Sequence, residues 1–148
     1  MKNEIINQIK MNGYKVEEVD ESVFATRDNT PIIMIKFHDH GVNFYGQFNS
    51  NNLSVNDSVG FKSYINELNI SSNITSFCTS KDGLFQFTAN YLGNYNEYSF
   101  AQFIRLWEYD VINLLDDNTK SFMYLGSNED VAIEYGISNA SSSLSAAA

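Results

Sequence analysis

The chain has 148 residues, 43% of them apolar, and is therefore long enough to bury a core of its own. Its 9 Lys and Arg against 18 Asp and Glu give a net charge of −9, which repels phosphate backbones and anionic lipid, so neither nucleic acid nor a membrane is expected as a partner. A single cysteine (Cys78), no apolar run typical of a signal peptide and no segment long enough to span a bilayer together favour a cytoplasmic protein.

The first half of the chain predicts a helix followed by strands. Isoleucines at helical spacing predict a helix over residues 2–12, and Gly13 is placed to take a left-handed conformation after it. Apolar, β-branched or alternating segments then predict four strands, at residues 16–19, 23–24, 32–35 and 42–48. The third is a continuous apolar run and is expected near the centre of a sheet. Asn, Ser and Asp dominate residues 49–58, which favours a long loop there.

The middle of the chain predicts a second helix and a hairpin. Apolar residues keep helical spacing over residues 61–68, and Asn69 is expected to end that helix. Asp57 or Ser58 can serve as its N-cap, because both side chains can accept from first-turn amides. Residues 74–79 and 84–91 then predict the two arms of a hairpin that turns at residues 81–83.

The strongest amphipathic pattern follows the hairpin. Seven apolar residues recur at helical spacing and would form one stripe that covers a sheet, namely Phe100, Phe103, Ile104, Trp107, Val111, Leu114 and Leu115. Ser99 is expected as the N-cap of this helix, with Gln102 completing a capping box. Beyond Asp116 the pattern indicates a further strand over residues 122–125 and a helical turn over residues 131–135.

These elements predict an α+β fold in the order helix, strands, helix, hairpin, helix, with a mostly antiparallel sheet. The chain contains no internal repeat and no linker, so a single domain is expected over residues 1–136. Residues 137–148 are mostly Ser and Ala and have too few large apolar groups to offset the entropy of ordering. A flexible tail is therefore expected there.

No set of residues in the sequence predicts a reaction. His38, Asp39 and His40 are residue types that could hold a metal ion. In an extended chain, however, only the two histidines would share a face, and no third ligand is identified beside them. A turn accounts for these residues. Carboxylate pairs such as residues 116–117 lie at the ends of elements, where charge is simply solvated. We therefore expect a protein without catalytic residues, metal or cofactor, and not an enzyme.

The outer side of the last helix indicates a binding surface. Leu106, Tyr109 and Ile112 lie there among polar residues, and on an isolated monomer their apolar side chains would remain in water. Burial of such side chains in a partner is favourable. The sequence therefore predicts that these three residues bind a polypeptide partner, first a second copy in a homodimer. Any aromatic surface left by the sheet would then take a protein or peptide client by strand addition or in side-chain pockets. The acidic surface would favour a basic client.

Several local features occur together in the order found in a known fold family. They are residues 13–14 closing the first helix, Thr30-Pro31-Ile32-Ile33 opening a central strand, Ile65-Asn66-Glu67-Leu68-Asn69 ending the second helix, Asp82-Gly83-Leu84 turning the hairpin, and a last helix from Phe100 to Leu115. In these features the chain resembles the type III secretion chaperone-like fold and, within it, the YbjN-type bacterial proteins. The resemblance implies a non-enzymatic binding protein, often a homodimer, that holds an extended or partly unfolded polypeptide segment.

A cytosolic immunity protein that neutralises a basic toxin is the alternative, since a small acidic domain suits that task equally well. A small enzyme is a third hypothesis. Gene neighbourhood distinguishes the first two: a secretion apparatus or effector gene next door favours a chaperone-like role, and an adjacent toxin gene favours immunity.

Overall fold

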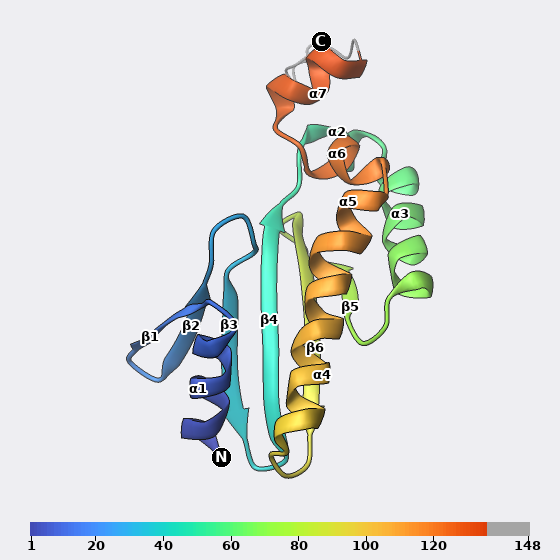
Figure 1. Cartoon of the computed structure of the whole chain (residues 1–148). Helices are drawn as coiled ribbons and strands as arrows, with labels where there is room; N and C mark the ends of the chain where they lie inside the picture. Colours follow the sequence, from blue (N-terminus) through green and yellow to red (C-terminus); the bar gives the residue numbers. More distant parts are fainter. Residues whose placement is uncertain (136–148) are drawn as a thin grey trace.

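The computed structural model describes residues 1–135, which form one antiparallel sheet with helices on one of its faces (Figure 1). The strands are β1 (Lys15–Val19), β2 (Ser22–Thr26), β3 (Ile33–His38), β4 (Gly41–Asn49), β5 (Ser76–Thr79) and β6 (Leu84–Leu92). The helices are α1 (Lys2–Met11), α2 (Asn52–Asn56), α3 (Ser58–Ser71), α4 (Glu97–Glu108), the π-helix η1 (Tyr109–Leu114), α5 (Leu115–Asp117), α6 (Lys120–Leu125) and α7 (Asn128–Tyr135). The expected tail, residues 137–148, lies outside the described residues.

The six strands lie in the order β1-β2-β3-β4-β6-β5, and every neighbouring pair is antiparallel. The α+β prediction is therefore confirmed, and the apolar run at residues 32–35 does enter a central strand. The expected hairpin at residues 74–91 is also present as β5 and β6. Gly13 follows α1 with φ of +91°, a left-handed conformation that favours glycine.

The two faces of the sheet differ because side chains alternate along each strand. One face is apolar and buried, with Val42, Phe44, Phe85, Phe87, Ala89 and Tyr91 contributed by the two longest strands. The intervening residues of β4 and β6 are polar and half-buried or exposed. They bond across the strands: Asn43 Nδ2 donates to Thr88 Oγ1 at 2.8 Å, and Gln86 Nε2 donates to the Tyr45 hydroxyl at 2.7 Å. This open face is therefore a ladder of hydrogen-bonded polar groups.

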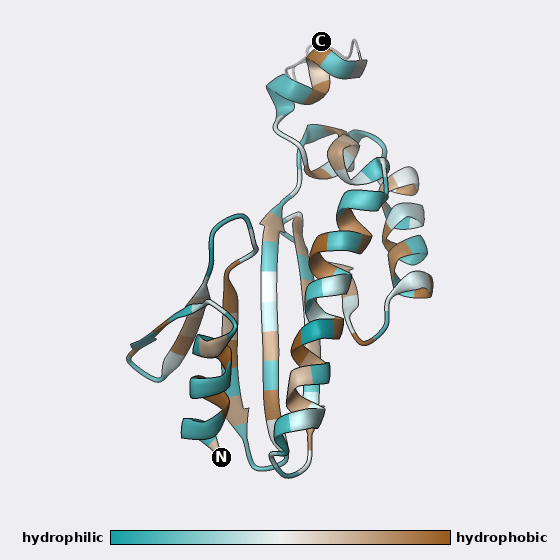
Figure 2. Ribbon diagram, in the orientation of Figure 1, coloured by the Kyte–Doolittle hydropathy of each residue, from teal (hydrophilic) through white to brown (hydrophobic). Residues whose placement is uncertain are grey.

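The longest helical segment runs from α4 through η1 to α5 and packs along the apolar face of the sheet (Figures 1 and 2). Its expected stripe is buried at Phe100, Phe103, Ile104, Trp107, Val111 and Leu115, whereas Leu114 is only half-buried. The predicted start at Ser99 is wrong. The N-cap is Asn96, whose side chain accepts from the Ser99 amide at 3.0 Å, and the Gln102 side chain pairs with Arg105 instead of returning to the first turn.

Two predictions about the polar connections are also wrong. Residues 49–58 contain α2 in place of a continuous loop, and residues 122–125 belong to the helix α6 in place of a strand. The reason is a set of hydrogen bonds between these two segments, which are distant in the sequence. Asn51 is 7% exposed and its amide nitrogen donates to the backbone oxygens of Met123 at 2.8 Å and Gly126 at 2.9 Å, while its side-chain oxygen caps α2 at the Ser54 amide. One asparagine thus fixes both segments.

The helix α3 begins where expected but ends later than predicted. Asp57 is its N-cap and accepts from the Gly60 amide at 3.1 Å. Asn69 does not end the helix, because its carboxamide pairs with the edge strand β5: it donates to the Phe77 oxygen at 2.9 Å and accepts from the Phe77 amide at 2.7 Å. These two bonds use the backbone groups to which a further strand would bond. They leave the Phe77 peptide unavailable for pairing with another chain.

Tyr64 of α3 gives the fold a pH dependence. It is fully buried, and its hydroxyl lies 2.6 Å from Ser121 Oγ. Burial raises the pKa of Tyr64 to about 12, against about 10 for an exposed tyrosine. At pH values between these two pKa values, the unfolded chain binds fewer protons than the folded chain, so the free energy of unfolding falls as pH rises. The contribution of Tyr64 is complete below about pH 10 and is lost by about pH 12.

We therefore expect the unfolding free energy of the wild type to fall with pH more steeply than that of Tyr64→Phe, by about 1 kcal/mol per pH unit between those limits. Other buried tyrosines titrate equally in both proteins and cancel in the comparison. Denaturant unfolding at a series of alkaline pH values measures the difference. Parallel curves for the two proteins would show that Tyr64 is not protected from ionisation in the folded state.

Candidate functional site

An apolar groove of about 570 Å³ lies where the β2–β3 loop and the end of β4 meet the helical segment from η1 to α6. Its apolar lining comes from three separate parts of the chain, namely Pro31, Phe48, Val111, Ile112, Leu115, Phe122 and Leu125. Polar side chains from the β2–β3 loop and the α5–α6 connection complete the rim. The volume lies within the range of about 300–1,000 Å³ that is usual for ligand sites.

The helical wall of the groove is held in place by Asp110. This residue of η1 has 0% exposure, and its carboxylate accepts four hydrogen bonds from the α3–β5 loop. The donors are the Asn73 amide at 2.9 Å, Asn73 Nδ2 at 3.0 Å, the Ile74 amide at 2.9 Å and the Thr75 amide at 3.0 Å. Three of them are backbone N–H groups that would otherwise lack an acceptor. Asp110 therefore ties one side of η1 to the protein, and the neighbouring Val111 and Ile112 line the groove.

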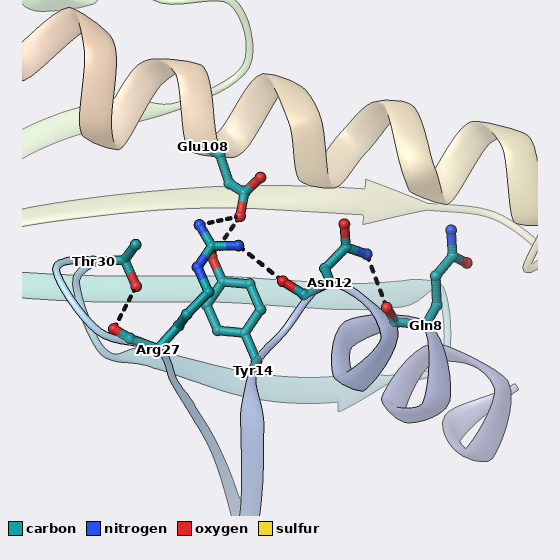
Figure 3. Close-up of polar contacts among 6 residues, drawn as sticks. All are labelled: Gln8, Asn12, Tyr14, Arg27, Thr30 and Glu108. Atoms are coloured by element: carbon teal, nitrogen blue, oxygen red, sulfur yellow. Dashed lines mark hydrogen bonds and ion pairs between the residues drawn. The ribbon is translucent and has the colours of Figure 1, made fainter.

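The opposite wall is joined to the same helix by the Tyr14 cluster, which consists of Tyr14, Arg27 and Glu108 (Figure 3). The Arg27 guanidinium lies 4.4 Å from the centre of the Tyr14 ring and forms an ion pair with Glu108 Oε2 at 2.8 Å. The Tyr14 hydroxyl donates to the same oxygen at 2.7 Å. Glu108 is the last residue before η1, so the cluster connects the end of β2 to the start of the π-helix.

The Tyr14 cluster also shapes the β2–β3 loop. The backbone oxygen of Arg27 accepts from Thr30 Oγ1 at 2.9 Å and from the Thr30 amide at 3.2 Å, which forms the turn that places Thr30 and Pro31 at the groove (Figure 3). Burial, together with the nearby Glu108 carboxylate, raises the pKa of Tyr14. The hydroxyl is therefore a neutral donor at ordinary pH and its role in the cluster is structural.

The three residues predicted to bind a partner are not brought together at the groove. Ile112 lines it, whereas Leu106 is half-buried, Tyr109 is 49% exposed, and neither is part of the lining. The groove lies beside the later part of the helical segment, where Val111, Ile112 and Leu115 line it, and Leu106 and Tyr109 come before that part. Binding of a second copy or a client through all three residues stays a prediction.

Most of the groove could not be identified from the sequence. Pro31, Phe48 and Leu125 come from separate parts of the chain and meet only in three dimensions. Asp110 did carry a signal. It lies three residues after Trp107, at a position where the apolar stripe returns to the core, and a carboxylate at such a position needs hydrogen-bond donors.

The histidines form the turn expected between β3 and β4. The His40 amide donates to His38 Nδ1 at 3.3 Å, and the two rings meet edge to face with centroids 6.5 Å apart. Within residues 1–135, no group of three or more His, Cys, Asp or Glu side chains is arranged to hold a metal ion. None of the helices in the same part of the chain is both long and apolar enough to cross a membrane.

The geometry defines an α+β protein in which a six-stranded antiparallel sheet carries helices on its apolar face and leaves a polar face open. Among solved structures it is similar to the crystal structure of YbjN from E. coli, a proposed transcription regulator, with a TM-score of 0.59 and 13% sequence identity. The match covers 75% of this chain and 85% of the YbjN chain. No protein-family model matches the sequence, and no curated protein matches it. The YbjN-like fold expected from the resemblance is thus confirmed, and the likeness shows the fold alone.

Proposed function

We propose that this protein is a non-enzymatic binding protein whose groove beside η1 holds an apolar segment of another polypeptide. The observation that carries the proposal is the apolar lining of the groove, which is contributed by Pro31, Phe48, Ile112 and their neighbours. Asp110 and the Tyr14 cluster fix its two walls, and a binding surface that is already formed loses little entropy when a partner arrives.

The composition of the groove favours binding over catalysis. Asp116 is the one charged side chain among the described residues that line it, and general acid–base chemistry commonly needs at least a second positioned group. An apolar centre with a polar rim is the usual anatomy of a protein interface. The Asn69 side chain already bonds to the backbone N–H and C=O of Phe77 at the β5 edge. Binding of a client in the groove is therefore favoured over binding by strand addition at that edge.

A regulatory role of the kind proposed for YbjN would suit this chain only through a protein partner, because a net charge of −9 repels DNA. The immunity hypothesis is compatible with the same groove, since a basic toxin would be one kind of polypeptide partner. A toxin gene beside this gene would favour immunity over a chaperone-like role.

The proposal predicts that a groove variant loses binding while a neighbouring surface variant keeps it. Short peptides selected from a random display library on the full chain serve as probes. Ile112→Asn is expected to weaken their binding about 10-fold or more, because a polar group replaces an apolar contact worth at least about 1.4 kcal/mol. Tyr109→Asn, on the same π-helix but outside the groove lining, is the matched control. Fluorescence anisotropy of labelled peptides measures both.

Thermal unfolding of the two variants verifies that each remains folded. If Tyr109→Asn abolished binding and Ile112→Asn left it unchanged, the client would bind the outer helix face and not the groove. If the library yielded no peptide that depends on Ile112, the groove would not be a polypeptide site.

A further inference from the structure

We infer that the polypeptide segment held in the groove carries Lys or Arg beside its apolar side chains. The inference rests on the proposed function and specifies its partner. Asp116 lines the groove and Asp117 follows it in the chain, whereas Asp28, which precedes Asn29 of the lining, belongs to a second hollow beside Gly13 and Lys15. Asp116 and Asp117 are both exposed, and neither takes part in an ion pair within residues 1–135.

The cations nearest to the groove in the chain are already neutralised. Arg27, on the β2–β3 side, forms its ion pair with Glu108 at 2.8 Å. Lys120, on the α6 side, forms an ion pair with Glu67 of α3, with Nζ and Oε2 2.5 Å apart. Each of these cations is therefore paired with a glutamate outside the groove lining. The charge that remains beside the groove is therefore negative and comes from Asp116 and Asp117.

The lining and the rim together restrict the partner. The groove favours a bulky aliphatic or aromatic side chain, because a polar side chain would lose its hydration without gaining hydrogen bonds. Asp116 and Asp117 favour cationic side chains beside that anchor and oppose acidic ones, and such complementarity raises the association rate and the specificity. Because the aspartates are exposed, salt must weaken this contribution.

The test uses a display library of short random peptides, selected at low ionic strength on the full chain. Selected sequences are expected to combine large apolar residues with Lys or Arg. A labelled member is then measured on a double variant, Asp116→Asn with Asp117→Asn, which removes rim charge while keeping side-chain size. We expect binding to weaken about 3- to 10-fold, as for the loss of two exposed charge pairs. Added salt should remove most of the difference.

The matched control is Asp20→Asn with Asp39→Asn, which removes the same charge from the β1–β2 and β3–β4 turns. It should change binding less than about twofold, because long-range effects of exposed charges are screened. Peptides that need Ile112 but contain no basic residues, or that bind the rim variant as tightly as the wild type, would overturn the inference and leave the proposed function standing. Peptides that bind independently of Ile112 would overturn the proposed function itself.

Discussion

Replacing Trp107 by alanine is expected to lower the free energy of unfolding by about 3–5 kcal/mol. Trp107 is 1% exposed and lies between the long helix and the sheet. Its ring meets that of Phe44 edge to face and that of Phe87 at an intermediate tilt, both with centroids 5.6 Å apart. Truncation removes these contacts and leaves a cavity that the surrounding rings can fill only in part.

Tyr98→Ala is the matched control for this change, because Tyr98 is an aromatic residue of the same helix that is 85% exposed. Its loss should alter stability by no more than about 0.5 kcal/mol. Denaturant unfolding measures both variants. A change of less than about 1 kcal/mol for Trp107→Ala would mean that this side chain does not anchor the core.

The second large effect is expected for Asp110→Ala, at about 3–5 kcal/mol. The substitution removes the acceptor of the Asn73, Ile74 and Thr75 amides; the bond from Thr75 is buried and the other two are partly buried. Each buried donor left without an acceptor costs about 1–3 kcal/mol. The α3–β5 loop should separate from η1, so the Ile74 and Thr75 amides should also lose protection in hydrogen exchange.

Asp117→Ala provides the control, because it removes an exposed aspartate of the same helical segment and should change stability little. Asp110→Asn keeps one acceptor oxygen and should give an intermediate loss. If Asp110→Ala cost less than about 1 kcal/mol and left the two amides protected, the carboxylate would not be what holds η1 to the loop.

The regular parts of the fold were predictable because they depend on local periodicity. The stripe from Phe100 to Leu115 and the alternation in β4 and β6 are each visible within a short window of sequence. The helix starts were less predictable. Asn96, in place of Ser99, caps α4, and both residue types are good N-caps. Periodicity does not decide between two such candidates that are close in the sequence.

The errors share a physical cause, which is that tertiary hydrogen bonds overrode local preference. Asn51 bonds to backbone groups more than 70 residues away, and the segment around it becomes helical against its composition. Asn69 pairs with β5 and does not stop its helix. Of the candidate site, the sequence identified only Ile112. Leu106 and Tyr109 precede the part of the helical segment that lines the groove, and the other walls come from distant segments.

The central claim is that the groove beside η1 receives a polypeptide segment, and methyl NMR of the full chain titrated with a selected peptide tests it most directly. The claim predicts the largest shifts at the methyl groups of Ile112, Leu115 and Leu125, which line the groove. The methyl groups of Ile70, exposed on α3, should not move. Shifts confined to Ile70 or to the open sheet face at Met34, with Ile112 unchanged, would contradict the claim.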